Sequence, residues 1–315
     1  MTSPRPGKKR TAARKARDEQ ARALAADHDG VAHRGDLRRI GITRHHIRNE
    51  VAAGRWGTVG NQTVVIPAAP LSQRARLRSA VWEFGTHAAL DGVAALQAAG
   101  LTGFETDTID ISTPHRVPRK RMSGIRHHRR RIMPKVITAG IPRIHPAIAL
   151  IAAAARAVSE RQAALLISLV LQQRIVSAEH LLLAWARTGR IKRRRFLEII
   201  IADACNGAHS LGELDFAALC RKYGLPPPDR QVVRRTPRGR VYLDVCWSAI
   251  GLVVEIDGGH HGLALHPVDD ALRQNEVVIS GNRVLRIPVA GLRINEAEFM
   301  HQVLRAFALL SAAAA

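Results

Sequence analysis

The sequence predicts a multidomain α+β protein, with an N-terminal helical module, a middle α/β and helical region, and a C-terminal α/β sheet. Three observations support this prediction. A chain of 315 residues is longer than one small domain requires. Its apolar residues, 46% of the total, recur at helical spacing through the middle of the chain. The last hundred or so residues instead alternate short apolar strands with helices.

The charge of the chain points to a polyanionic partner. Lys and Arg number 48 against 26 Asp and Glu, which gives a formal net charge of +22 and a pI near 11.5. Nucleic acid is the commonest polyanion that such a field attracts. Charge alone also leaves a ribosomal or membrane-surface partner open. Only seven of the basic residues are Lys, a bias that a GC-rich genome explains, but such a genome does not explain the excess of positive charge.

Cysteine spacing and the N-terminal residues predict the compartment. Cys205, Cys220 and Cys246 lie far apart without a Cys-x-x-Cys pair, so we expect reduced core residues and no zinc site or disulfide scaffold. Residues 1–20 are basic and lack the apolar stretch of a signal peptide, and we expect a flexible tail. No apolar run approaches the roughly 20 residues of a membrane span. The sequence therefore predicts a soluble, cytoplasmic protein with no membrane partner.

Residues 21–70 contain three short helical patterns followed by two short strands. Thr43 is placed to cap the third helix, and Gly60-Asn61 is a hairpin turn signal. This order is typical of a winged helix-turn-helix, which reads DNA with its third helix. The expected elements are helices at Ala21–Asp27, Arg34–Ile40 and Thr43–Gly54, and strands on either side of Gly60-Asn61.

The third helix supplies the candidate base-reading residues. Ile47 and Val51 should face the core, which leaves the opposite face outward. Arg pairs with guanine and Asn with adenine in the major groove. The alternative is a solvated helix face without base contacts. The outward residues are Arg44, His45, Arg48 and Asn49, and the expected phosphate contacts are Arg38, Arg39, Arg55 and the cluster Arg126–Arg131, including Arg126 and Arg129.

Residues 71–155 and 156–206 predict an α/β region and then a helical connector. A helix-rich piece from Leu71 to Leu101 precedes a strand at Thr108–Ser112. Residues 115–135 hold nine Arg or Lys and no acidic residue. Apolar residues then recur at helical spacing through residues 142–186, and a basic cluster at residues 187–195 separates them from a further helix that ends at a boundary, Asn206-Gly207.

The segment 207–315 predicts a small sheet that gathers three carboxylates. Glu255 and Asp257 are two positions apart in one strand and therefore point to one side of it. A short turn brings Asp244, on the preceding strand, alongside. The expected elements are helix Leu211–Tyr223, strands Gln231–Arg235, Val241–Trp247 and Leu252–Asp257, helix Val268–Ser280, strand Arg283–Pro288 and helix Glu296–Ser311.

A divalent cation is the expected partner of these carboxylates. The stretch 241–272 holds five carboxylates, three His and no Lys or Arg. Unpaired carboxylates repel one another and resist desolvation, so we expect a cation between Asp244, Glu255 and Asp257. Oxygen ligands in this number suit Mg²⁺ or Mn²⁺, which activate water and neutralise a scissile phosphate. For any one of these carboxylates, a helix cap or a solvated position is the alternative.

The C-terminal motifs carry a family resemblance. They are Leu243-Asp244, Glu255-Ile256-Asp257, His260-His261, Asp270-x-x-Arg273 and Gly281–Arg286. With them, residues 207–311 resemble a bacterial domain of uncharacterised function in the PD-(D/E)XK superfamily, related to the very-short-patch repair endonucleases. The resemblance implies a restriction-endonuclease-like sheet, Asp244, Glu255 and Asp257 as catalytic metal ligands, and Glu213 as a further acidic residue. Asp257 stands where the superfamily has a Lys, and the resemblance implies that His260 or His261 acts as a base or orients water.

The N-terminal motifs carry a second resemblance. They are Gly30–Arg44, Gly54-Arg55-Trp56 and Gly140-Ile141-Pro142. With them, residues 23–155 resemble the antitoxin of AbiE abortive-infection systems. This resemblance implies a DNA-binding regulator with a cognate toxin as partner.

Together these observations predict a protein that binds double-stranded DNA and hydrolyses a phosphodiester of it with Mg²⁺ or Mn²⁺, in defence or repair. The alternative is an antitoxin-type transcriptional regulator whose nuclease fold is inactive. Loss of the motif Lys favours the regulator, whereas the three carboxylates favour the enzyme. RNA binding is a third hypothesis. The target sequence and the oligomeric state stay open.

Overall fold

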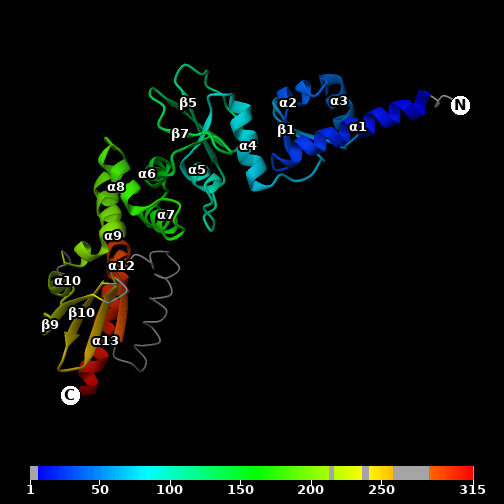
Figure 1. Ribbon diagram of the computed structural model, residues 1–315. Coiled ribbons are helices and arrows are strands. Elements are labelled where there is room, and N and C mark those ends of the chain that lie inside the picture. The colour runs from blue at the N-terminus through cyan, green and yellow to red at the C-terminus, as the bar shows by residue number, and fades with distance from the viewer. Residues whose placement is uncertain (1–5, 213–215, 236–240, 258–283, 315) are drawn as a thin grey trace. The chain divides into compact units, whose positions relative to one another are not determined.

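The structure is a computed structural model that describes residues 6–212, 216–235, 241–257 and 284–314 (Figure 1). The chain divides into two compact units, one formed by residues 1–100 and 105–145, the other by residues 101–104 and 146–315. Both units combine helices with small sheets, so the predicted α+β class is confirmed. None of the described helices combines the length and apolar character that crossing a bilayer requires.

The first part of unit 1 is a helical module with a three-stranded antiparallel sheet of order β1-β3-β2. Leu37, Ile47 and Trp56 are central to its core. The helix expected from Arg34, the helix capped by Thr43 and the hairpin are confirmed, and β1 was not expected. The elements are α1 (Pro6–Ala26), β1 (Val31–His33), α2 (Arg34–Arg39), α3 (Arg44–Ala52), β2 (Gly57–Val59) and β3 (Thr63–Val65).

Helix α1 corrects the expectation of a flexible tail. It begins at Pro6 instead of Ala21 and runs for 21 residues. Ala21 and Ala25 are fully buried in the module's core. Trp56 Nε1 donates a hydrogen bond of 2.8 Å to Asp18 Oδ1. This contact joins residues far apart in the sequence, so no local pattern could predict that the helix extends past Ala21 towards the N-terminus.

The second part of unit 1 is a five-stranded sheet of order β6-β5-β4-β8-β7. The strand expected at Thr108–Ser112 is present as β5, and β6, which pairs with it in parallel, was not expected. The sequence of β6, IRHHRR, has Ile125 as its single apolar residue, so it shows no apolar face. The elements are α4 (Gln73–Phe84), β4 (Ala89–Asp91), α5 (Gly92–Ala98), β5 (Ile109–Pro114), β6 (Ile125–Arg130), β7 (Val136–Ile137) and β8 (Arg143–Ile144).

Unit 2 begins with four helices, in agreement with the helical pattern of the sequence. Ser159 and Ser177 cap the second and third of them. The last one passes through Asn206-Gly207 and continues to Gly212, so the helix end expected there is wrong. The first one starts unit 2 at Pro146, ahead of the boundary expected after residue 155. The helices are α6 (Pro146–Arg156), α7 (Glu160–Gln172), α8 (Ala178–Ala186) and α9 (Arg194–Gly212).

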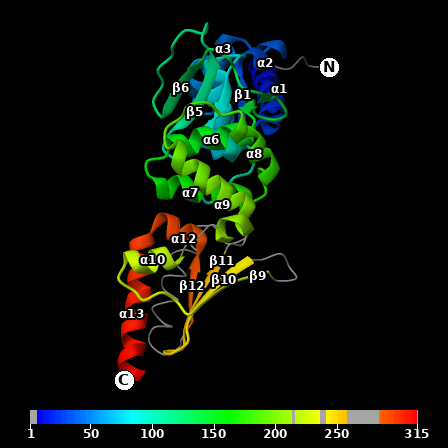
Figure 2. The same ribbon diagram turned by 90° about the vertical axis from the view of Figure 1, so that its left-hand side faces the viewer.

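The rest of unit 2 is a four-stranded sheet of order β12-β11-β10-β9, along one side of which the last helix, α13, runs (Figure 2). Val254 and Ile256 pack there against Phe299 and Met300 of α13. The expected strands are confirmed, whereas the helix expected at Val268–Ser280 lies outside the described residues. The elements are α10 (Phe216–Lys222), β9 (Arg230–Arg235), β10 (Val241–Trp247), β11 (Leu252–Asp257), β12 (Val284–Pro288), α12 (Val289–Ile294) and α13 (Glu296–Ala314).

The cysteines behave largely as expected. All three carry free thiols. Cys205 and Cys220 are buried, whereas Cys246 is half-buried. Burial raises the pKa of Cys205 to about 11, so this thiol is an unreactive part of the core.

Candidate functional site

Helix α3 has one face in the core and one face in solvent. Ile47 is 3% exposed, and Val51 packs against the same core cluster. Asn49 Nδ2 lies 3.1 Å from His45 Nε2, one helical turn earlier, so these two side chains are held together. The outward residues are Arg44, His45, Arg48 and Asn49, all exposed. Their predicted orientation is the one observed, while their contact with bases stays a prediction.

Reciprocal capping between Thr43 and His46 closes the first turn of α3. His46 N donates to Thr43 Oγ1 at 3.4 Å, and Thr43 N donates to His46 Nδ1 at 3.2 Å. A ring nitrogen that accepts a hydrogen bond carries no proton, so His46 is neutral in this arrangement. Burial lowers the pKa of His46, and the charge of Arg17 lowers it further. Protonation of His46 would therefore break the cap beside Arg44.

The three arginines near α3 that were expected to contact phosphates differ in their surroundings. Arg38 is exposed and makes no ion pair or side-chain hydrogen bond with the described residues. Arg39 pairs with Asp36. Arg55 pairs with Glu50, whose side chain is 9% exposed. Arg55 is therefore engaged in neutralising a buried carboxylate of α3, and Arg38 is the most available of the three.

A buried carboxylate from α4 fixes the turn between β2 and β3. The side chain of Glu83 is 1% exposed. It accepts hydrogen bonds from the backbone N–H groups of Asn61, Gln62 and Thr63 at 2.8, 2.7 and 3.0 Å, and from the Thr63 hydroxyl at 3.1 Å. Gly60 has φ +60°, and a Cβ there would lie 2.5 Å from Glu83 Oε2. No local sequence signal connects Glu83 with this turn, so its role could not be predicted from the sequence.

Strand β6 uses part of its positive charge inside the fold. Arg130 donates to the fully buried Asp91 and, at 3.2 Å, to Ser112 Oγ. Arg130 therefore has a structural role, and its expected contact with phosphate stays a prediction. Arg126 is exposed and its Nη1 lies 3.7 Å from Asp110 Oδ1. Arg129 is exposed too, and it donates to a backbone carbonyl of the preceding loop.

Two histidines of β6 to which the sequence assigned no partner have partners. His128 Nε2 lies 2.6 Å from Asp110 Oδ1. His127 Nδ1 accepts a hydrogen bond of 3.2 Å from Lys120 N, so the proton of the neutral ring is on Nε2, 2.8 Å from Thr113 Oγ1. Burial lowers the pKa of His127. Both histidines therefore have structural partners within the sheet, and we assign neither of them a binding or catalytic role.

The C-terminal sheet brings the positions of the three predicted carboxylates together. Asp244 on β10 and Glu255 on β11 are direct partners in the antiparallel register. Partners of this kind share one face of a sheet, and alternation returns Asp257 to the same face. Val254 and Ile256 are fully buried on the opposite face. The predicted convergence is therefore confirmed for the backbone, while the side chains of Asp244 and Asp257 lie outside the described residues.

Arg286 is an unexpected cationic neighbour of Glu255. It stands beside Glu255 in the parallel register of β11 and β12. Arg286 Nε donates to Glu255 Oε2 at 3.0 Å, with side chains 73% and 33% exposed. The expectation of a carboxylate site without a nearby cation is therefore wrong, because it counted only charges close in sequence. An ion pair this exposed contributes little, roughly 0–1 kcal/mol, so a ligand can displace it.

Three other predicted site residues, Glu213, His260 and His261, lie outside the described residues. Within the described ranges, no three His, Cys, Asp or Glu side chains are arranged to hold a metal ion. The donor set of Asp244, Glu255 and Asp257 is entirely carboxylate oxygen, which fits a hard divalent ion. The metal site therefore stays a prediction whose backbone geometry is suitable.

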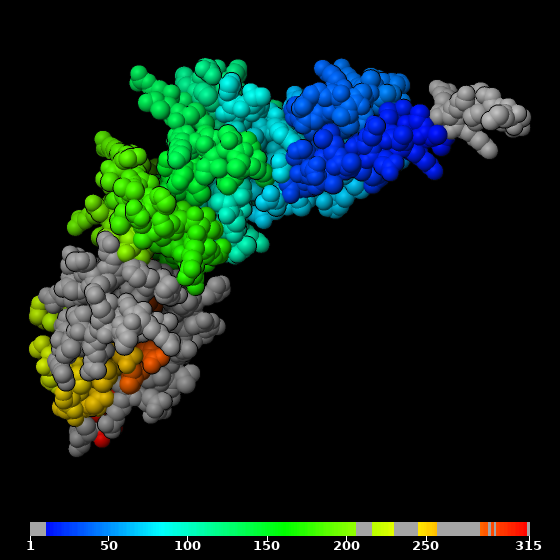
Figure 3. All heavy atoms as spheres, in the orientation of Figure 1, coloured from blue at the N-terminus to red at the C-terminus, as the bar shows by residue number. Residues whose placement is uncertain are grey.

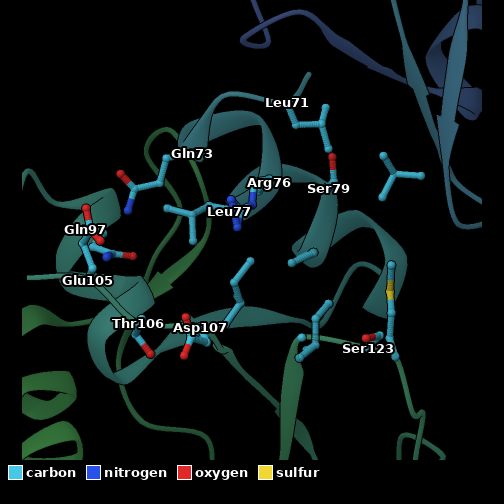
Figure 4. Close-up of a pocket in the computed structure, with 16 residues that line it drawn as sticks. Leu71, Gln73, Arg76, Leu77, Ser79, Gln97, Glu105, Thr106, Asp107 and Ser123 are labelled. Atoms are coloured by element: carbon cyan, nitrogen blue, oxygen red, sulfur yellow. The ribbon is translucent and has the colours of Figure 1, made fainter. Parts of the chain in front are cut away.

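A pocket of about 600 Å³ lies in unit 1, between α4, the start of β5 and the segment leading into β6. Its volume is that of a small-molecule site. Figure 4 shows Gln73, Gln97 and Glu105 together at one end of it. Its charged lining residues are Arg76, Glu105 and Asp107. This mixture defines no single ligand class, and none of the predicted site residues lines the pocket.

Comparison of the chain with protein-family models gives no match. Comparison with curated proteins gives none either.

Proposed function

We propose that the protein binds double-stranded DNA and uses α3 as its recognition helix. The order of helices and strands around α3 supports assigning the module to the winged helix-turn-helix class. The observation that carries the proposal is the division of α3 into a core face with Ile47 and an exposed face with Arg44, Arg48 and Asn49. Arg and Asn are the side chains that read guanine and adenine in the major groove.

Binding of selected and scrambled duplexes by the Arg48→Ala variant tests this proposal. A target would first be enriched from random duplexes with the wild-type protein. Loss of a bidentate base contact costs about 1–3 kcal/mol, so the variant should bind the selected duplex roughly 5- to 150-fold more weakly. Arg76→Ala, which removes an equally exposed Arg from α4, is the matched control and should bind normally. If Arg48→Ala bound the selected duplex as tightly as the wild type, α3 would not be the reader.

We further propose that the C-terminal sheet domain is a metal-dependent DNA endonuclease of the PD-(D/E)XK type. The register that opposes Asp244 to Glu255, with Asp257 two positions along, supports this proposal. These three residues would hold Mg²⁺ or Mn²⁺, which neutralises a scissile phosphate and makes a bound water more acidic. Glu255 is partly exposed, so its carboxylate is open to a ligand from solvent.

The remaining roles follow from the chain's own residues. Arg286 would hold Glu255 in one orientation and supply a positive charge beside it. Strand β11 itself lacks such a charge, because Asp257 stands where the superfamily has a Lys. His260 or His261 would accept the proton of the attacking water, and Glu213 would complete the acidic set; these assignments rest on the resemblance of their motifs. The water oxygen forms a bond to phosphorus while the bond to the leaving oxygen breaks, and that oxygen takes up a proton.

One observation favours a second function, an antitoxin-type transcriptional regulator with an inactive nuclease fold. The Arg286–Glu255 ion pair satisfies the carboxylate without a metal ion. The Lys expected two positions after Glu255 is replaced by Asp257. In such a regulator α3 would still read DNA, and a cognate toxin would be the partner.

A plasmid-nicking assay in Mg²⁺, Mn²⁺ or EDTA separates the two functions. The wild type should nick DNA with either ion and not in EDTA. Glu255→Ala should lose cleavage and keep wild-type DNA affinity in EDTA, because distant sites without shared partners behave additively. Glu298→Ala removes an exposed Glu of α13 and should leave both properties intact. Failure of the wild type to cut any DNA with either ion would favour the regulator.

A further inference from the structure

Helix α1 has two halves of different composition. Its C-terminal half is anchored in the core by Ala21, Ala25 and the hydrogen bond from Trp56 to Asp18. Its N-terminal half, residues 6–17, has no acidic residue. The basic residues of that half are Lys8, Lys9, Arg10, Arg14, Lys15 and Arg17. At about 1.5 Å per residue the basic half is roughly 18 Å long.

The basic half of α1 lies beside the proposed recognition helix. Arg14 Nη1 is 3.8 Å from Glu50 Oε2 on α3. Burial and then the charge of Arg17 lower the pKa of His46, also on α3. Arg10, Arg14 and Arg17 have the spacing i, i+4, i+7, which places these three positions on one face of the helix. We call Arg10, Arg14, Lys15 and Arg17 the basic row; its members Arg14 and Arg17 lie beside α3.

Part of this row is open to solvent, and its like charges cost the helix stability. Lys15 is exposed, and Arg14 and Arg17 are half-buried. In Figure 3 the dark blue atoms of the part of α1 from residue 11 on lie at the surface, next to the lighter blue atoms of α2 and α3. Like charges one turn apart destabilise a helix. The fold nevertheless keeps these residues helical, which is explained if an anionic partner neutralises them.

We infer that the basic half of α1 binds DNA phosphates flanking the groove that α3 enters. The inference rests on the proposed DNA binding and adds a second contact element to it. Elements beside a recognition helix face the DNA backbone, where Arg and Lys position the protein without reading sequence. A row of cations without an exposed aromatic or amide side chain suits phosphates better than bases.

The salt dependence of DNA binding tests the inference. The triple variant Arg10→Gln, Lys15→Gln, Arg17→Gln keeps residues that favour helix and removes three charges. Each lost phosphate contact lowers the slope of log K against log salt by about 0.9, so the slope should fall by about 2–3 units. Affinity for selected and scrambled duplexes should fall together, by tenfold or more at about 150 mM salt. The measurement uses the full chain in EDTA, so that no cleavage intervenes.

A matched variant with Arg187→Gln, Arg190→Gln and Arg195→Gln loses the same charge from an exposed segment of unit 2 and should keep its slope. An unchanged slope in the α1 variant, with normal wild-type binding, would overturn the inference and leave the role of α3 standing. Equal losses in both triple variants would overturn it too, since they would indicate a non-specific effect of net charge. A wild type that bound no duplex would instead refute the proposed function itself. An α1 variant with normal DNA binding that no longer bound an acidic polypeptide, poly-Glu, would assign the row to a protein partner.

Discussion

Replacing Glu83 by Ala should destabilise unit 1 more than any single surface change. Glu83 accepts three backbone N–H groups and one hydroxyl from the turn between β2 and β3, and its side chain is 1% exposed. Thr63 is fully buried, so both of its donors would lose their partner without gaining water. An unsatisfied buried donor costs about 1–3 kcal/mol. Asn61 and Gln62 are exposed, and water can replace part of what their N–H groups lose.

The expected loss is therefore about 3–4 kcal/mol, because these contributions are not fully additive. Glu83→Gln keeps Oε1 for Gln62 and Thr63 and loses only the contacts of Oε2, so it should cost about 1–2 kcal/mol. Glu105→Ala removes an exposed Glu of the same unit and should stay within about 0.5 kcal/mol of the wild type.

Scanning calorimetry of the full chain measures this series, since the two units are expected to give separate transitions. In a unit of this size each kcal/mol shifts the melting temperature by about 3–4 °C, so Glu83→Ala should lower the unit 1 transition by about 10 °C. If the unit 1 transition of Glu83→Ala had the same melting temperature as that of Glu105→Ala, the reasoning would be refuted, because the carboxylate would contribute no net stability to the turn.

Two further predictions concern pH and metal. The pKa values of His46 and His127 are lowered in the folded protein, chiefly by burial, so the unfolded chain binds their protons more tightly. The free energy of unfolding should therefore fall as the pH drops below about 6.5, and urea titrations between pH 5 and 8 should lose part of this dependence in His46→Gln. Saturating Mn²⁺ should raise the melting temperature of the wild type, since it binds only the folded state, and Asp244→Asn should abolish the rise. Constant melting across millimolar Mn²⁺ would indicate a degenerate site.

The sequence was sufficient to predict those elements that depend on residues a few positions apart. Thr43 caps α3 and Ile47 fills the core because the cap and the helical period each involve residues a few positions apart. The β10–β11 pair was predictable for the same reason, since a four-residue turn joins two apolar strands and sets the register of Asp244 against Glu255. Prediction of the carboxylate positions therefore needed nothing beyond the alternation of a strand.

The failures all depend on partners distant in sequence. The sequence of helix α1 resembles that of a charged tail, because the hydrogen bond that holds the helix joins Asp18 to Trp56, 38 residues away. The sequence of strand β6 resembles that of a basic loop, because the strand is defined by its backbone pairing with β5 and by the ion pair of Arg130 with the buried Asp91. Arg286 was visible in the motif of the last strand, but only the parallel pairing of β11 and β12 puts it beside Glu255.

Ion pairs between residues distant in sequence also reduce the positive charge that is available to an anionic partner. Arg55 neutralises Glu50, Arg130 neutralises Asp91, and Arg78 pairs with Asp29, so these three positive charges are engaged within the fold. The salt slope depends on the number of phosphates that the protein contacts, so it cannot be estimated from the total of 48 basic residues. Among the arginines whose charge stays available, the exposed Arg44 and Arg48 of α3 lie near the basic half of α1. We therefore expect that the positive charges of α3 and of the basic half of α1, and not the net charge of the whole chain, determine the salt dependence of DNA binding.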